Sequence, residues 1–206
     1  GDLTAAYPWL TEPSQVWGVD WTAVPGGVDG ALSPSLEAMW APSDALRLQA
    51  SYAYLDAKYD KYIDAGVDEA DNRTFIHAPE NSFNLLADAR IARTAWGDLR
   101  GMLVYSWTDD YFTYPYQLAR SGPRYNPAAA IAGDTRIKSY GVLNARLALT
   151  DITLKGSQAE IALWSRNLTD EEQILNYIDF GPAFGSMTDA YYLTPRTYGL
   201  EVSFRW

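Results

Sequence analysis

The chain contains no cysteine and only one histidine among its 206 residues. Without cysteine it has no disulfide framework and no thiolate to serve as a nucleophile or a metal ligand. The histidine, His77, lies in a polar stretch beside Pro79 and Glu80, and it has no second histidine or cysteine with which to bind a metal ion. We therefore expect neither a disulfide-stapled fold nor a zinc site.

Basic residues are also few. Lysine and arginine number 16 against 26 aspartate and glutamate residues, which gives a net charge of −10 and a pI near 4.5. Proteins that bind nucleic acid gain much of their affinity from lysine and arginine side chains that neutralise phosphates. We therefore expect no nucleic-acid partner.

Long hydrophobic runs are missing as well. The sequence has no stretch of about eighteen consecutive apolar residues, so it contains no candidate for a transmembrane helix. If such a chain crosses a bilayer, a closed β-barrel is the structure that allows it. The mean hydropathy of −0.24 fits strands in which apolar and polar residues alternate.

That alternation is clearest at the end of the chain, in PRTYGLEVSFRW (residues 195–206). Because successive side chains of a strand point to opposite faces, the odd and even positions separate into two sets. Tyr198, Leu200, Val202, Phe204 and Trp206 fall on one face, and Gly199, Glu201, Ser203 and Arg205 on the other. Either a half-buried strand of a soluble sandwich or a strand of an outer-membrane barrel would show this pattern.

The same period-two pattern recurs along the chain. It is found in residues 28–40, 45–59, 81–94, 99–109, 140–150 and 158–168 as well as in the last strand. Residues 45–59 contain many helix-favouring residues, but their strict alternation favours a strand. Residues 1–27 have no clear period, and we interpret them as a loop or partial strand of a preceding region, with a short strand around 15–21 as one alternative. Pro34 suggests a bulge or a weakly paired stretch.

The connections between these strands alternate in length. Residues 41–44, 95–98 and 151–157 make short connections, whereas 58–79, 111–138 and 169–192 make long ones. Outer-membrane barrels have short periplasmic turns and long extracellular loops. The sequence therefore predicts an all-β, antiparallel up-and-down transmembrane β-barrel. Seven strands cannot close a barrel with an aqueous or plugged lumen, and single-chain bacterial barrels have even strand numbers. We therefore expect a partial barrel whose other strands lie N-terminal.

Aromatic residues make up 14% of the chain, and their positions follow the strand ends. Trp40, Trp96 and Trp206 lie at the short-connection ends, while Tyr52, Tyr54, Trp107 and Tyr140 lie toward the long connections. Barrels carry aromatic girdles at both bilayer interfaces, so we interpret these residues as girdles. The alternative is the aromatic core of a soluble barrel.

Aromatic residues in the long connections are candidates for ligand contact. Tyr111, Phe112, Tyr114 and Tyr116 would lie on loops above a rigid barrel, where a ligand could stack, although they could also extend a girdle. Phe180 and Phe184 share this ambiguity.

The acidic residues offer little for catalysis or metal binding. The acidic cluster Asp68, Glu69, Asp71 and Asn72 lacks the spacing of an EF-hand loop, and we interpret it as a solvated loop. Asp109 and Asp110 are adjacent, so in a strand they would point to opposite faces and could not act as an acid–base pair. We expect no catalytic residue, cofactor or metal site, and no enzyme activity.

Three segments together resemble one family. SYAYLDAKYD at 51–60, RNLTDEE at 166–172 and PRTYGLEVSFRW at 195–206 are similar, in this order, to the C-terminal third of a TonB-dependent outer-membrane receptor. The resemblance covers residues 28–206. It implies a parent barrel of roughly twenty-two strands blocked by an N-terminal plug, and this chain matches part of the barrel but no plug.

The resemblance also implies a function and partners. A scarce ligand such as a siderophore–iron complex, cobalamin or a glycan would be taken up across the bacterial outer membrane with energy from the TonB complex, which acts through the absent plug region. The other partners would be outer-membrane lipid and the barrel-assembly machinery, which would read Tyr198, Gly199, Leu200, Val202, Phe204 and Trp206. A passive porin-like channel, an adhesin or assembly platform, and a soluble lipocalin-like protein remain alternatives.

Overall fold

The computed structural model describes residues 16–22, 33–64, 66–113, 136–154, 156–180, 185 and 187–205. In these ranges the chain is all-β, with no α-helix and a single 3-10 turn at Ala70–Asn72. None of the helical structure in the described part is long and apolar enough to span a membrane.

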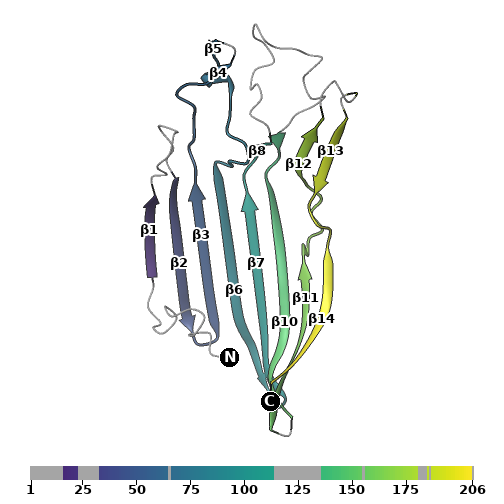
Figure 1. Ribbon diagram of the computed structural model, residues 1–206. Helices are drawn as coiled ribbons and strands as arrows, with labels where there is room; N and C mark the ends of the chain where they lie inside the picture. The colour runs from purple at the N-terminus through teal and green to yellow at the C-terminus, as the bar shows by residue number, and fades with distance from the viewer. Residues whose placement is uncertain are drawn as a thin grey trace.

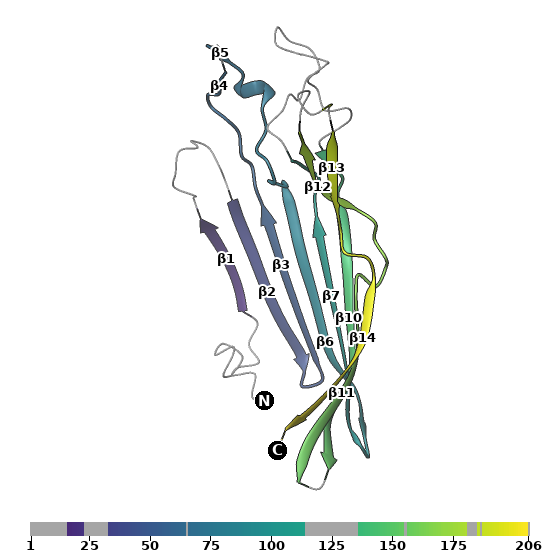
Figure 2. The same cartoon turned by 45° about the vertical axis from the view of Figure 1, so that its right-hand side comes forward.

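Eight strands form one antiparallel sheet in up-and-down order (Figure 1). They are β1 (Val16–Thr22), β2 (Ser33–Ser43), β3 (Leu46–Tyr54), β6 (Asn81–Thr94), β7 (Gly97–Thr108), β10 (Tyr140–Leu154), β11 (Ser157–Arg166) and β14 (Thr197–Arg205). The sheet is open, because β1 and β14 stand at its two edges and do not pair with each other. It is a single curved layer (Figure 2), consistent with part of a barrel.

The seven predicted strands are present, and β1 adds an eighth at the place where a short strand was an alternative. Residues 44–45, 95–96 and 155–156 make the short connections, each tighter than predicted because the strands extend further. All three lie at one end of the sheet, and the long connections leave from the opposite end (Figure 1). The alternation of connection lengths is therefore confirmed as an arrangement in space.

The long connections contain short strand pairs that the sequence pattern missed. These are β4 (Ile63–Asp64) with β5 (Val67–Asp68), β8 (Tyr111–Phe112) with β9 (Arg136–Ile137), and β12 (Ile174–Asp179) with β13 (Thr188–Tyr192). The last pair forms a hairpin whose register shifts between Ile174 and Asn176. Such a shift breaks the alternation from which strands are predicted.

Of the two alternatives at Pro34, the structure shows no bulge, but Pro34 has no partner in the β2–β3 register, as a weakly paired stretch would show. Pro34 pairs in continuous register with Trp21, whereas the β2–β3 register shifts between Trp40 and Ser43. Pro42 lies inside this shift. Proline has no N–H to donate to a ladder, so a bulge accommodates it without the loss of a hydrogen bond.

A second bulge shapes the short-connection end. The β10–β11 register shifts between Leu149 and Ile152, and Asp151 between them has a left-handed φ of 59°. Opposite it, Gly97 has a φ of 148°, and a Cβ there would lie 2.2 Å from the Thr150 carbonyl oxygen. Only glycine permits this close approach of β7 to β10.

The register separates the side chains into two faces, because directly paired residues of an antiparallel sheet share a face. We call them the apolar face and the polar face. The apolar face carries Leu36, Leu48, Tyr52, Phe83, Leu85, Leu103, Trp107, Leu143, Leu147, Ile161, Leu163, Leu200, Val202 and Phe204. The polar face carries Glu37, Gln49, Ser51, Asn84, Asp88, Arg90, Arg100, Asn144, Arg146, Glu160 and Glu201.

The apolar face is not covered by any other described part of the chain. Leu200 is 64% exposed, Phe204 59% and Val202 49%. Buried apolar residues are correspondingly few in the described ranges, and Ile137, Ala148, Ala159 and Ala162 make up that set. Because burial of apolar surface is the main favourable term in folding, this sheet needs a non-aqueous environment against its apolar face.

Candidate functional site

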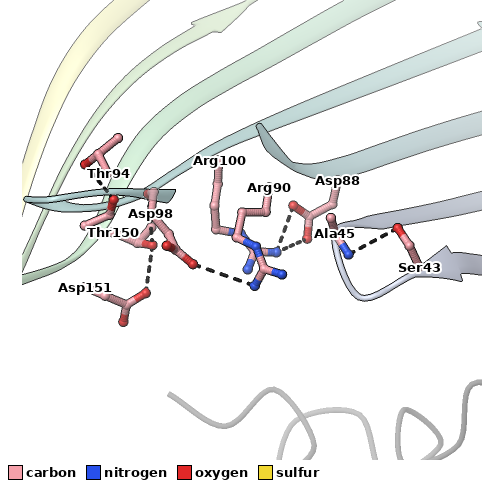
Figure 3. Close-up of polar contacts among 10 residues, drawn as sticks. Ser43, Ala45, Asp88, Arg90, Thr94, Asp98, Arg100, Thr150 and Asp151 are labelled. Atoms are coloured by element: carbon pink, nitrogen blue, oxygen red, sulfur yellow. Dashed lines mark hydrogen bonds and ion pairs between the residues drawn. The ribbon is translucent and has the colours of Figure 1, made fainter. Parts of the chain in front are cut away.

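The polar face carries a ladder of charged side chains across its central strands. Arg100 of β7 donates to both carboxylate oxygens of Asp88 on β6, at 3.1 and 2.8 Å. Arg90 of β6 lies 3.7 Å from the carboxylate of Asp98 on β7. Figure 3 shows these four side chains on one side of the sheet. Alternating charge keeps the two arginines, which are direct cross-strand neighbours, paired with carboxylates.

A second charged group continues the ladder toward the edge strand. Arg146 of β10 forms a short ion pair with Glu160 of β11 and lies 3.7 Å from Glu201 of β14. These side chains are about one third to one half exposed, so each pair adds little stability, about 0 to 1 kcal/mol. Their main effect is to make one face of the sheet compatible with water.

The polar face also contains a contact that sequence reasoning missed. The indole of Trp164 lies across Gly199, its direct partner on β14, and a Cβ on Gly199 would be 2.6 Å from the Trp164 Cζ2 atom. The Arg166 guanidinium lies 5.7 Å from the centre of the same indole. Gly199 therefore leaves room for an aromatic ring, a role that appears only when the β11–β14 register is known.

Several girdle candidates form an aromatic row near the long connections. Tyr52 pairs with Phe83, and Phe83 pairs with Trp107 and stacks on it with 5.3 Å between ring centres. The Tyr52 hydroxyl donates to the Asn81 side chain at 2.6 Å. Tyr54 lies next to this row and shares its face by register, as a partner of Asn81.

The other girdle candidates are placed differently. Trp40 and Trp96 are exposed at the short-connection end, 50% and 76% respectively. Tyr140 pairs with Thr108 on the polar face, so it does not belong to the apolar-face row. Trp206 lies outside the described residues.

The ligand-contact candidates are only partly described. The Tyr111 hydroxyl donates to the Leu175 carbonyl oxygen at 2.8 Å, and burial, with a smaller effect from Tyr140, raises its pKa to about 12. The Arg136 guanidinium lies 5.9 Å from the centre of the Phe112 ring. Tyr114, Tyr116 and Phe184 lie outside the described residues, and Phe180 is 39% exposed. The Tyr111 hydroxyl thus has a protein partner, and ligand contact by this group stays a prediction.

The acidic residues of the long connection between β3 and β6 (residues 55–80) bond to other residues of the same connection. Asp68 accepts hydrogen bonds from the Tyr62 and Ala70 amides, which lower its pKa. Glu69 pairs with Arg73 at 2.5 Å, and both side chains are 8% exposed. In the described ranges no three His, Cys, Asp or Glu side chains are grouped so as to hold a metal ion.

Asp109 and Asp110 likewise have separate partners. Asp109 accepts from the Asn81 amide side chain at 2.9 Å, and Asp110 pairs with Arg136. Both residues lie between β7 and β8 rather than within a strand.

The segment RNLTDEE is organised around a buried asparagine. Asn167 is 3% exposed and has a left-handed φ of 50°. Its side chain accepts from the Glu171 amide at 2.8 Å and donates to the Glu171 and Thr194 carbonyls at 3.0 and 3.1 Å. Its own amide donates to the Asn144 side chain at 3.0 Å. Asn167 therefore joins β10, the end of β11 and the approach to β14.

A shallow hollow lies on the apolar face, over the middle strands. Its volume is about 520 Å³, and its lining includes Ala87, Ala89, Gly101, Ala145 and Leu147. The lining is nearly all apolar, which suits hydrocarbon better than a polar ligand.

Comparison with known proteins gives a likeness in fold. No protein-family model matches the chain, and no curated protein matches it. Among solved structures, the ferric yersiniabactin uptake receptor FyuA from Yersinia pestis matches with a TM-score of 0.61 and 16% sequence identity. The match covers 84% of this chain and 23% of that receptor. The chain is therefore similar in fold to part of that uptake receptor and spans about a quarter of its length.

Proposed function

We propose that this chain forms part of the barrel wall of a TonB-dependent receptor, which takes up a scarce ligand across the bacterial outer membrane. The single observation that carries the proposal is the separation of the two faces over the seven strands from β2 to β14. One face is a continuous surface of exposed apolar side chains, and the other holds ion pairs and amides. A strand wall between lipid and a wet lumen needs this separation.

Energetics favour one orientation of the wall. If the polar face met lipid, Arg100, Arg146 and their carboxylate partners would lie in hydrocarbon, and each arginine near the midplane would cost about 2 to 4 kcal/mol. With the apolar face outward, the same residues line the lumen. The aromatic row at Tyr52, Phe83 and Trp107 then lies where a girdle belongs, near one bilayer interface.

The proposal assigns further partners. Membrane lipid covers the apolar face, and the barrel-assembly machinery reads Tyr198 to Trp206 on the last strand. The long connections face outward, where Phe112, Tyr114 and Tyr116 would meet the ligand. Contact with TonB belongs to a plug region preceding this stretch, so uptake is a property of the full-length protein. The fold likeness to the ferric yersiniabactin uptake receptor covers 23% of that receptor, and it supports the class of protein rather than the ligand.

The test uses the full-length protein in a Gram-negative host. Membranes are separated by density, and cells with and without a functional TonB are supplied with ⁵⁵Fe as ferric yersiniabactin or with ⁵⁷Co-cobalamin. We expect the protein in the outer membrane and accumulation of one labelled probe only when TonB is present.

Other outcomes would point elsewhere. Accumulation that is equal with and without TonB would favour a passive channel. Surface binding without accumulation would favour an adhesin. Recovery of the protein in the aqueous fraction would contradict a membrane barrel altogether.

A further inference from the structure

Three long connections leave the sheet at the same end (Figure 1). The first joins β3 to β6 (residues 55–80), the second joins β7 to β10 (109–139), and the third joins β11 to β14 (167–196). Each would be free to move independently if it were attached only through its own two strands. Contacts between them decide whether they do.

The first and second connections are joined at β8. The His77 amide donates to the Phe112 carbonyl oxygen at 2.8 Å, and Ile76 forms a parallel bridge with Phe112. The His77 and Tyr111 rings lie 5.6 Å apart. His77 holds a left-handed φ of 50°, a conformation that a non-glycine residue keeps only when its surroundings fix it.

The second and third connections are joined by the neighbouring residue. Tyr111 donates its hydroxyl to the carbonyl oxygen of Leu175 on β12, at 2.8 Å and 64 positions along the chain. Its strand partner on β9, Ile137, is 1% exposed and is the largest fully buried side chain among the described residues. The Tyr111 hydroxyl, whose pKa is raised by burial, is protonated at neutral pH, as an ordinary tyrosine hydroxyl also is.

These contacts meet at one point, which we call the loop knot: Ile76, His77, Tyr111, Phe112, Ile137 and Leu175. Two adjacent residues of β8 thus contact the other two connections. Phe112 accepts from the first connection through its main-chain carbonyl, and Tyr111 donates to the third through its hydroxyl. The loop knot lies beyond the ends of β6 and β7, and its Tyr111 also interacts with Tyr140, the first residue of β10.

We infer that the loop knot makes one described segment of each long connection, residues 73–79, 136–140 and 174–179, unfold locally and re-form as one cooperative unit, with the Tyr111 hydroxyl as the link to the third. A contact made on the outer surface by any one connection is then transmitted to the other two. Such coupling requires one structural element whose equilibrium between two states is shifted by contacts at either site. The inference does not depend on the ligand or on TonB, so it can fail while the proposed function holds.

The test is hydrogen–deuterium exchange of the full-length protein in detergent, comparing the parent with Tyr111→Phe. The substitution keeps the ring and removes the hydroxyl that donates to Leu175 and interacts with Tyr140. We expect exchange to become about three- to tenfold faster in peptides covering residues 73–79, 136–140 and 174–179 together. Peptides covering β6 and β7 should be unchanged.

Tyr191→Phe is the matched control, because it removes a hydroxyl from a more exposed position on the same hairpin as Leu175. It should leave all three peptides unchanged. A second variant, Ile137→Ala, removes buried volume from the loop knot and should speed exchange in the same three peptides.

Three results would overturn the inference. One is faster exchange in residues 174–179 alone, which would mean that the connections open separately. Another is no change in Tyr111→Phe. The third is equal loosening of the β6 and β7 peptides, which would mean that the loop knot is not separable from the sheet.

Discussion

At the scale of single residues, Gly199 and Asn167 make structural contacts that their sequence context does not indicate. Gly199 reads as one of six positions of an assembly signal, yet its backbone lies under the Trp164 indole. Asn167 falls near the end of the predicted strand 158–168, yet it is 3% exposed and bonds to three parts of the chain. In both cases a close contact across strands gives the residue its importance.

Gly199→Ala should place a methyl group against the Trp164 ring and destabilise the barrel by about 1 to 3 kcal/mol, as overpacking does. Combining it with Trp164→Ala should remove the clash, so the double variant should lose less than the sum of the two single changes. The measurement is the temperature at which the full-length protein loses its folded mobility on electrophoresis. If the losses add, Gly199 matters for a reason other than Trp164, such as recognition during assembly.

Asn167→Ala should leave the Glu171 amide and the Glu171 and Thr194 carbonyls without their partner, at a cost of about 2 to 3 kcal/mol. Asn167→Gly should cost roughly 1 kcal/mol less, because glycine adopts the left-handed φ of 50° without strain. The same electrophoretic midpoint reports both. A smaller loss for alanine than for glycine would contradict the account, since alanine suffers the strain in addition.

At the scale of elements, the strands and their faces follow from period-two alternation, and the parts that depend on register do not. Leu86 interrupts the alternation of its strand, and the structure places it opposite Val104 on the polar face. The bulge at Pro42 and the hairpin β12–β13 were not predicted, because a bulge shifts the period that the prediction uses.

The candidate site shows the same division. Alternation predicts that Arg100 and Arg146 share a face, but their carboxylate partners follow only from strand pairing. Tyr111 was recognised as a loop aromatic, whereas its bond to Leu175 joins residues far apart in the sequence. Contacts of this kind leave no local pattern to detect.

Adjacent residues of β7 test the assignment of the faces. Leu103 lies on the apolar face and Met102 on the polar face, with exposed fractions of 49% and 36%. Leu103→Arg should cost about 2 to 4 kcal/mol near the bilayer midplane and lower the amount of full-length protein in the outer membrane. Met102→Arg should be tolerated, because its cross-strand neighbours, Asp88 and Arg146, carry one charge of each sign. The measurement is the amount of heat-modifiable protein in purified outer membranes.

The matched pair makes the result decisive. Both variants introduce the same side chain one position apart, so a general effect of arginine on expression would lower both equally. Equal loss would contradict the two-face assignment, and a greater loss for Met102→Arg would reverse it.

At the scale of the whole molecule, the sheet has two unsatisfied edges in the part that the structure describes. β1 and β14 each have one neighbour, and the sheet between them is open. In hydrocarbon every unpaired backbone N–H or carbonyl costs several kcal/mol, so a wall with open edges is not stable in a bilayer. The polar face would also lack the rest of the lumen.

We therefore expect residues 1–206, expressed alone with an export signal, to give no heat-modifiable and protease-resistant species in the outer membrane. Co-expression with the proposed upstream barrel strands as a separate chain should restore that species, because those strands would supply partners for both edges. Barrels of eight strands do exist, so the outcome is not fixed by strand number alone. A heat-modifiable, protease-resistant product from residues 1–206 alone would mean that β1 and β14 close on each other. The chain would then be a small barrel in its own right, with no room for a plug and no need for upstream strands.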